Sequence, residues 1–365
     1  MTVPRTLSGY LARHFLVWVG GAYAAMLALV LLIEVVELLR RASAKEEATF
    51  AVVLDMALLR LPFLAQKLVP YAVLFGGMTA FWRLTRSREL VVVRAAGLSV
   101  WQFLLPALGL AFLIGVITIT TFNPVAAVMQ SRYEQLESKY LRGRSSLLAV
   151  SSTGVWLRQL DPGGQSVIHS QRASLQTMEF SDVIIFLFEG RDKFIGRIDA
   201  ASATLRDGFW QIKDAWFTGT DRPARFESTH ALKTDLTLDK IQDAFASPQS
   251  ISFWELPGFA GTLESAGFSG LRHRLYWHSL LADPIVLCAM VLFAAAFTLR
   301  PAIERGATLM MVGGGVLTGF VLFFLSDVVF ALGLSASVPV ALAAWTPAVA
   351  SVMVGLTLLL HLEER

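Results

Sequence analysis

The chain has 365 residues, of which 55% are hydrophobic and only 16% charged, and its mean hydropathy is +0.58. Ordinary soluble domains carry about 25% charged residues, so this composition excludes a water-soluble enzyme. The single cysteine, Cys288, excludes an intramolecular disulfide and a cysteine-based zinc site. In a membrane protein a net charge of +3 indicates topology rather than nucleic-acid binding.

Six apolar segments are longer than the roughly 20 residues that a transmembrane helix needs. They cover residues 15–39, 54–81, 100–122, 277–299, 307–334 and 338–360. Pro62 and Pro70 predict a kink in the second segment, and Asn123-Pro124 is expected to end the third. The sequence therefore predicts an α+β membrane protein with six transmembrane helices in a 3+3 arrangement. Arginines in the short connections place both termini and residues 82–99 in the cytoplasm by the positive-inside rule.

The polar middle of the chain is typical of β structure. Short β-branched stretches recur at residues 154–157, 166–169, 183–188, 194–198 and 209–212, with turn signals at 161–164 and 206–208. They predict an antiparallel sandwich or jelly roll of about 110 residues on the periplasmic side. Helical connectors are expected at 126–141 and 254–267. The predicted domains are 1–125, 126–253 and 254–365, with the last containing the second connector and the last three helices.

The connection between the second and third spans predicts a short capped helix at about residues 84–98. Ser87 suits its N-cap, Glu89 its first turn, Arg94 its last turn and Gly97 its C′ position. One interpretation is a positively charged loop that happens to be helical. The other is a coupling helix that receives force from a separate ATPase. The candidate coupling residues are Arg86, Arg88, Glu89, Leu90 and Arg94.

The candidate substrate site lies near the end of the first span. Glu37 lies three and four residues before Arg40 and Arg41, so all three share a helix face, and paired guanidiniums suit phosphate. Arg60 and Lys67 are seven apart on one face of the second span, where each would cost about 2.5–3.5 kcal/mol at the bilayer centre. They are therefore expected to face a cavity or lie shallow. For Glu37, Arg40 and Arg41 the alternative is interfacial snorkelling with local ion pairs.

Several kinds of chemistry have no motif in this sequence. There is no GxxxxGK[ST] loop for a nucleotide triphosphate, and no HExxH or GxSxG motif in a supporting context. His273 and His278 have no nearby carboxylate with ligand spacing. We therefore expect no metal, no cofactor and no self-contained enzyme. Asp327, in the fifth segment, is as well explained by a helix-packing contact as by a substrate contact.

Taken together, these features resemble the LptF/LptG permeases of lipopolysaccharide export over essentially the whole chain. The most specific match is Ser-Arg-Glu-Leu-Val-Val-Val-Arg-Ala-Ala-Gly at residues 87–97. Other matches are Val-Pro-Tyr-Ala-Val-Leu-Phe-Gly at 69–76, Phe-Asn-Pro at 122–124 and Leu-Arg-His-Arg-Leu-Tyr-Trp at 271–277. Residues 37–42 and 272–300 are more similar to the LptG branch than to LptF. The two branches share one fold and topology.

The resemblance implies a bacterial inner-membrane transport subunit. Its partners would be an LptF-type permease in a heterodimer, an LptB-type ATPase dimer, an LptC-type single-span protein and an LptA-type periplasmic bridge, with lipopolysaccharide as substrate. The family's coupling helix corresponds to Arg88, Glu89, Leu90 and Arg94, and its outer basic pair to Arg40 and Arg41. A basic residue of some members is Glu34 here, which argues against phosphate binding by Glu34. A non-transporting periplasmic scaffold is the rival interpretation, although it would need only one anchor.

Overall fold

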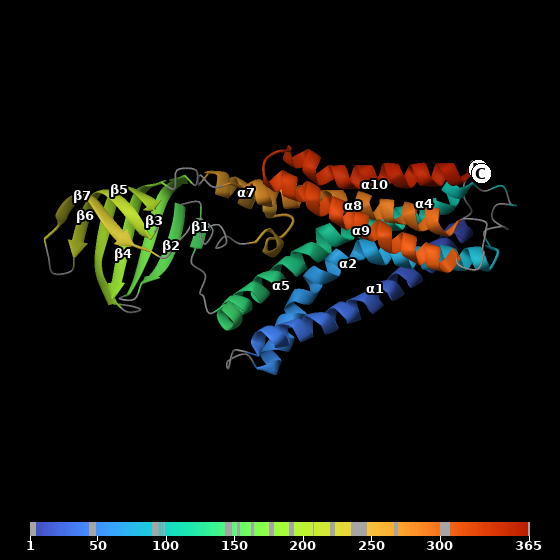
Figure 1. Ribbon diagram of the computed structural model, residues 1–365, viewed down its shortest axis with the longest axis horizontal. Coiled ribbons are helices and arrows are strands. Elements are labelled where there is room, and N and C mark those ends of the chain that lie inside the picture. The colour runs from blue at the N-terminus through green and yellow to red at the C-terminus, as the bar shows by residue number, and fades with distance from the viewer. Residues whose placement is uncertain are drawn as a thin grey trace. The chain divides into compact units, whose positions relative to one another are not determined.

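A computed structural model describes residues 5–43, 49–89, 95, 97, 99–142, 148–151, 154–161, 164–174, 179–189, 193–206, 208–219, 223–234, 247–265, 269–299 and 307–363. The chain forms two compact units. One comprises residues 1–133, 252–254 and 274–365 and contains the long helices; the other comprises residues 134–251 and 255–273 and contains the β-sheet (Figure 1).

The helical unit contains α1 (Arg5–Ala42), α2 (Phe50–Arg86), α4 (Val100–Ile117), the π-helix η1 (Thr118–Phe122), most of α5 (Asn123–Leu136), most of α8 (Leu271–Thr298), α9 (Ala307–Leu334) and α10 (Val340–Glu363). The predicted apolar segments are helical except at residues 299, 338 and 339. Five stretches of the described helices are long and apolar enough to cross a membrane: Thr6–Ala42, Val100–Leu141, Leu271–Thr298, Gly313–Leu334 and Val340–His361. Helix α2 is not among these five stretches. The 3+3 count therefore stays a prediction.

The prediction that Asn123-Pro124 ends the third span is wrong. Helices α4, η1 and α5 and the π-helix η2 (Glu137–Arg142) follow one another without a break. Pro124 has no N–H to donate to the carbonyl four residues earlier, that of Thr120. The indole Nε1 of Trp254 donates to this carbonyl instead, at 3.1 Å. A replacement donor and a π-turn together allow the helix to pass the proline.

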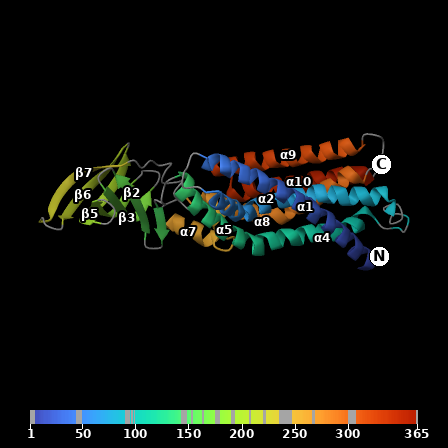
Figure 2. The same ribbon diagram turned by 90° about the horizontal axis from the view of Figure 1, so that it is seen from below.

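Close contacts between helices hold the helical unit together. A Cβ atom added at Gly76 of α2 would lie 2.4 Å from Val19 Cα of α1, so these helices touch at the backbone. Gly115 of α4 has the same relation to Pro284 of α8, at 2.6 Å. Figure 2 shows α1 crossing the other helices obliquely. A single apolar core spans α1, α2, α4, α8 and α10.

The β unit is a seven-stranded antiparallel sheet. Its strands are β1 (Leu148–Ser151), β2 (Gly154–Asp161), β3 (Gly164–Ser174), β4 (Glu179–Glu189), β5 (Lys193–Arg206), β6 (Phe209–Gly219) and β7 (Arg225–Lys233). Their order in the sheet is their order in the chain. The antiparallel β domain is thus confirmed, but its connectivity is a meander, whereas a jelly roll needs crossing Greek-key connections. Strands β1 and β7 were not predicted.

Helix α7 (Leu256–Ser265) packs on this sheet. Its Leu263 is buried in the sheet core together with Trp210, Phe180 and Ile185. The predicted connector at 254–267 is therefore helical over 256–265, but it belongs to the β unit rather than to the last three membrane helices. Residues 266–268 lie outside the described residues.

Five neighbouring strands share a line of interrupted pairing. The registers of β3 to β7 omit residues 171, 182, 201, 214 and 228, which lie opposite one another. Asp182 and Asp214 have φ values of +54° and +50°, in the left-handed region that Asp tolerates better than most residues. Along this line each pair of neighbouring strands skips one residue pair, and the register is the same before and after it.

Candidate functional site

The predicted basic pair is held by one carboxylate at the C-terminal end of α1. Arg40 donates through Nε and Nη2 to the two oxygens of Glu37, both at 2.9 Å, and Arg41 donates through Nε to Glu37 Oε1 at 2.8 Å. The side chains of Arg40 and Arg41 are 76% and 45% exposed. A guanidinium has five N–H donors, so Arg40 has three beyond its pair with Glu37. Glu37 thus holds the two guanidiniums on one side of the helix end.

Arg60 is paired to α1 instead of projecting alone. Its Nη1 donates to Glu34 Oε1 at 2.7 Å and contacts the Tyr133 hydroxyl at 3.4 Å, while its guanidinium lies 5.1 Å from the Tyr133 ring centroid. Its Nε is buried and has no partner among the described residues. Glu34 is nearly buried, so the pair ties α1, α2 and α5 together. The acidic residue at position 34 thus neutralises Arg60.

Lys67 has a different environment on the same helix. Its Nζ lies 4.7 Å from the Phe63 ring centroid, its side chain is exposed, and it interacts electrostatically with Asp327 of α9 and with Arg60. No carboxylate lies within ion-pair distance of Lys67 in the described part of the chain. Lys67 lies seven residues beyond Arg60 on α2, so it is further than Arg60 from the Glu37–Arg40–Arg41 cluster along the helix pair.

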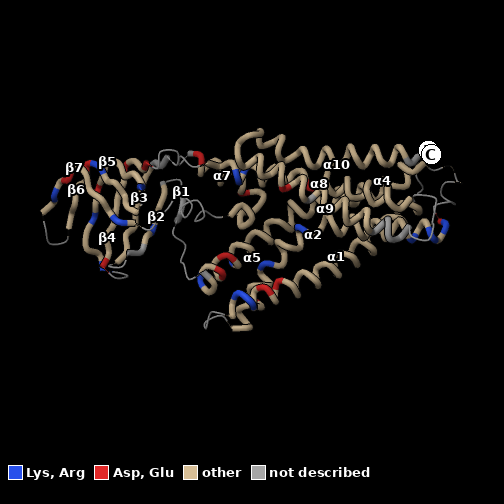
Figure 3. Tube along the Cα trace, viewed as in Figure 1, with Lys and Arg blue, Asp and Glu red and all other residues tan. Residues whose placement is uncertain are grey.

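Charged side chains also gather at the opposite ends of α1 and α2 (Figure 3). Helix α2 continues to Arg86, whose guanidinium lies 5.2 Å from the Trp82 ring centroid, so the predicted coupling helix cannot begin at residue 84. Ser87 is the C-cap of α2 rather than an N-cap, and Arg88 has a φ of +60°. Leu90 and Arg94 lie outside the described residues.

Gly97 has the backbone conformation predicted for it, and the Glu89 carboxylate has two hydrogen-bond donors. Gly97 has a φ of +80°, the left-handed conformation that a C′ glycine adopts. The Glu89 carboxylate accepts a hydrogen bond from Ser87 Oγ at 2.9 Å and another from the Tyr10 hydroxyl of α1 at 2.9 Å. The link from α1 to Glu89 could not be read from the sequence, because it joins residues 79 positions apart.

A buried polar junction was also missed. Asn123 is buried, donates through Nδ2 to Gln66 Oε1 at 3.2 Å and accepts from the Phe253 backbone N–H at 2.8 Å. The Tyr276 phenol forms a further side-chain hydrogen bond with Asn123. One amide thus joins α2, α5, α8 and the segment that precedes α7. The signal in the sequence was a lone Asn-Pro in an apolar run, which also fits a helix end.

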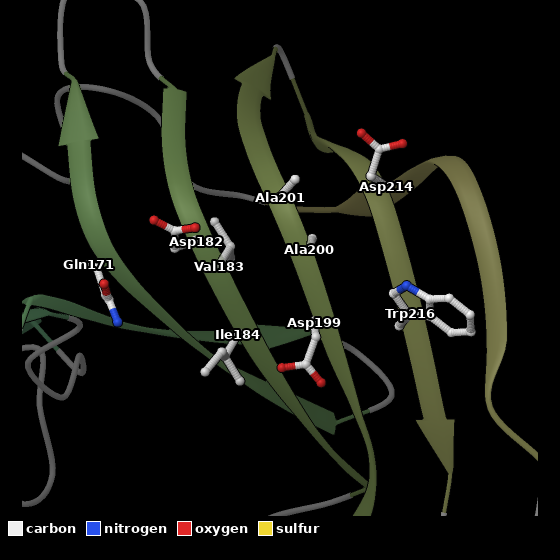
Figure 4. Close-up of a pocket in the computed structure, with 9 residues that line it drawn as sticks. All are labelled: Gln171, Asp182, Val183, Ile184, Asp199, Ala200, Ala201, Asp214 and Trp216. Carbon is white, nitrogen blue, oxygen red and sulfur yellow. The ribbon is translucent and has the colours of Figure 1, made fainter.

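The β unit carries a shallow pocket of about 340 Å³. Figure 4 shows Asp182, Asp199 and Asp214 around it, with Trp216 and Gln171 at its sides. Asp199 is paired with Arg197 at the sheet surface. The carboxylates make this pocket unsuitable for a phosphate-bearing headgroup, since like charges repel. Among the described residues no group of three or more His, Cys, Asp or Glu side chains is placed to hold a metal ion.

Comparison with known proteins agrees with this arrangement. The family model described as lipopolysaccharide export system permease LptF/LptG matches residues 9–361. The lipopolysaccharide export system permease protein LptG of Escherichia coli K12 is 23% identical over 312 residues, covering 83% of this chain and 84% of that protein. The protein of the same name from Haemophilus influenzae is 21% identical over 333 residues, covering 88% and 89%. The chain therefore belongs to the LptF/LptG family of lipopolysaccharide export permeases, which are multi-pass inner-membrane proteins.

Proposed function

We propose that this chain is an LptG-type permease subunit, which extracts lipopolysaccharide from the inner membrane when a separate ATPase hydrolyses ATP. The observation that carries the proposal is that α1 has charged contacts at both of its ends. One end of this apolar helix holds the Glu37–Arg40–Arg41 cluster, and the other end contacts Glu89 of the candidate coupling segment. A permease needs both a substrate contact and a contact for the motor. LptG is favoured over LptF because the similar relatives are named LptG.

The anionic headgroup would bind at the cluster on α1. Lipopolysaccharide carries phosphate on a glucosamine backbone, and planar guanidiniums bind phosphate bidentately. Glu37 holds Arg40 and Arg41 next to each other, so little side-chain entropy is lost when an anion binds. Lys67 would contribute a second positive charge. Arg60 would act indirectly, by holding α1 through Glu34, because its pairing leaves it with reduced net charge toward a ligand.

The acyl chains would lie along apolar helix surfaces. On α1 the side chains of Leu29, Leu32, Ile33 and Val36 are more than half exposed, and on α9 so are Phe320 and Phe324. Such a surface is stable next to lipid or next to an apolar partner helix. An LptF-type permease would complete the cavity on these faces, with both termini of the chain in the cytoplasm and the β unit in the periplasm.

The motor and the exit path would be supplied by other chains. An LptB-type ATPase dimer would dock on Arg86, Arg88, Glu89, Leu90 and Arg94, which explains a transport subunit without a P-loop. An LptC-type single-span protein and an LptA-type bridge would receive the lipid from the β unit. Co-purification of the chain with a P-loop ATPase is the first test, because a scaffold without transport has no need of one.

The headgroup site is tested by Arg40→Glu combined with Arg41→Glu. We expect the variant to assemble with its partners, because both side chains lie at the exposed end of α1, and to lose photo-crosslinking of lipopolysaccharide to α1. The matched control is Lys193→Glu with Arg225→Glu, which makes the same charge change at two exposed side chains of the β unit. Undiminished crosslinking in the α1 variant would assign Arg40 and Arg41 to interfacial snorkelling.

A further inference from the structure

Both oxygens of the Glu89 carboxylate are engaged by hydroxyl groups of the chain itself. Tyr10 donates to Oε2 from α1, and Ser87 donates to Oε1 from the neighbouring turn, each at 2.9 Å. Both donors are neutral hydroxyl groups, so neither bond is an ion pair. An ionised carboxylate has about four acceptor sites, and these two bonds use two of them. Glu89 can therefore be held by α1 and still accept a charged hydrogen bond from another protein.

A ladder of rings fixes Tyr10 on α1. Tyr10, His14 and Trp18 are spaced by four residues and share one face of the helix. The Tyr10 and His14 rings stack with centroids 6.0 Å apart, and the Trp18 ring lies edge-on to His14 at 6.3 Å. The Arg83 guanidinium of α2 lies 5.4 Å from the Trp18 centroid. The Tyr10 hydroxyl is thus positioned by packing that does not depend on its bond to Glu89.

Helix α1 is continuous from this ladder to the substrate cluster. Its 38 residues run from Arg5 to Ala42, which corresponds to about 57 Å at 1.5 Å per residue. No proline interrupts it. Figure 2 shows it as a continuous helix crossing the bundle. Tyr10, Arg40 and Arg41 therefore lie on one continuous helix, which is the physical connection between the two sites.

From these observations we infer that Tyr10 is a positioning residue through which α1 sets the orientation of the Glu89 carboxylate. In this way ATP hydrolysis by the partner ATPase responds to lipid bound at the other end of α1. The inference rests on the proposed function, in which Glu89 contacts the ATPase. Ser87 lies in the same turn as Glu89 and has no link to α1, so its hydrogen bond orients the carboxylate without carrying information from the lipid. Both hydroxyls donate to the same carboxylate, but only the Tyr10 hydroxyl belongs to α1.

The test is Tyr10→Phe in the purified complex of permease and ATPase. The substitution removes one hydroxyl and leaves the ring ladder in place. Hydrolysis is measured in nanodiscs of phosphatidylethanolamine and phosphatidylglycerol, with and without purified lipopolysaccharide, and expressed as the ratio of the two rates. We expect this ratio to fall toward unity in Tyr10→Phe. It should stay at the wild-type value in Ser87→Ala and in Tyr23→Phe, which makes the same change elsewhere on α1. The ratio is internal to each sample, so a lower yield of complex does not affect it.

Glu89→Gln separates this inference from the proposed function. Loss of ATPase association or hydrolysis in Glu89→Gln, together with loss of stimulation in Tyr10→Phe, supports both. A defective Glu89→Gln combined with a wild-type ratio in Tyr10→Phe overturns the role of Tyr10 and leaves the coupling role of Glu89 intact. A Glu89→Gln complex with normal yield, hydrolysis and export overturns the coupling role itself. Equal loss of the ratio in Tyr10→Phe and Ser87→Ala would show that the response requires both bonds to Glu89, including the one that does not come from α1, which also overturns transmission through α1.

Discussion

The ion pair between Glu34 and Arg60 offers the sharpest test of how α1 is held. The pair joins two helices at 2.7 Å, and its side chains are only 11% and 27% exposed. Removing one partner of a buried pair typically costs about 3–5 kcal/mol, because a charge is left without compensation. Partial exposure of Arg60 lowers this figure, so Glu34→Gln or Arg60→Met should each reduce the free energy of unfolding by about 2–4 kcal/mol.

The double variant should cost less than the two single changes together. Once both charges are absent, no uncompensated charge remains, and we expect a coupling energy of about 1–3 kcal/mol. The assay is unfolding in mixed micelles by titration with sodium dodecyl sulfate, followed by far-UV circular dichroism. The matched control is the exposed pair of Glu37 and Arg40, changed to Gln singly and together, for which coupling should not exceed about 1 kcal/mol.

Additive costs at Glu34 and Arg60 would refute this reasoning, since they would mean that the two charges do not depend on each other in the folded protein. A second measurement separates stability from substrate binding. If Arg60 acts only through Glu34, the folded double variant should retain crosslinking of lipopolysaccharide to α1. Loss of crosslinking without loss of stability would instead make Arg60 a direct contact for the lipid.

Two further predictions concern the junction at the end of the third apolar segment. Asn123→Ala leaves the Gln66 side-chain oxygen and the Phe253 N–H without their partner. Each unsatisfied buried group costs about 1–3 kcal/mol, so the thermal stability of the purified chain should fall clearly. Gln171→Ala, at an exposed site, is the control and should leave the thermal stability unchanged. Trp254→Phe removes the donor to the Thr120 carbonyl and should raise amide hydrogen exchange around η1 at a cost of about 1 kcal/mol; unchanged exchange there would mean that the carbonyl finds another donor.

The sequence was most informative where local composition decides the structure. Long apolar runs became helices, because a helix satisfies its own backbone hydrogen bonds. Alternating β-branched stretches became strands β2 to β6 for the corresponding reason, since one face of each strand is buried. Strand β7 was missed because most of its side chains are exposed on both faces, so there is no alternation to detect. Strand β1 has only four residues, too few for a pattern.

The third apolar segment shows why a local rule can fail. Asn-Pro normally ends a helix, because proline leaves one carbonyl without a donor. Here the donor comes from Trp254, 134 positions away, and no local pattern predicts that contact. The same argument covers the coupling segment. Its start was placed at residue 84 because capping residues follow, whereas packing extends α2 to Arg86.

In the candidate site, contacts within one helix could be predicted from the sequence, whereas contacts between helices could not. The contacts of Glu37 with Arg40 and Arg41 follow from spacings of three and four on one helix, so the sequence predicted them correctly. The contacts of Arg60 with Glu34 and of Tyr10 with Glu89 join different helices, so only the structure could provide them. Spacing alone placed Arg60 and Lys67 on one helix face but could not show that only Arg60 has an acidic partner within ion-pair distance.

Glu37 gives the proposed headgroup site a moderate charge, and this suits a transporter. Two guanidiniums and one carboxylate leave the cluster with a net charge of +1. Without Glu37 the arginines would repel each other and would bind a phosphate more strongly at full charge. A transport site must bind its substrate well enough to load it and weakly enough to release it. Because Glu37 accepts hydrogen bonds from both arginines, it fixes their geometry and also lowers the affinity that they would have for the lipid phosphate. The carboxylate that lowers affinity is therefore also the group that orients the two guanidiniums for the headgroup.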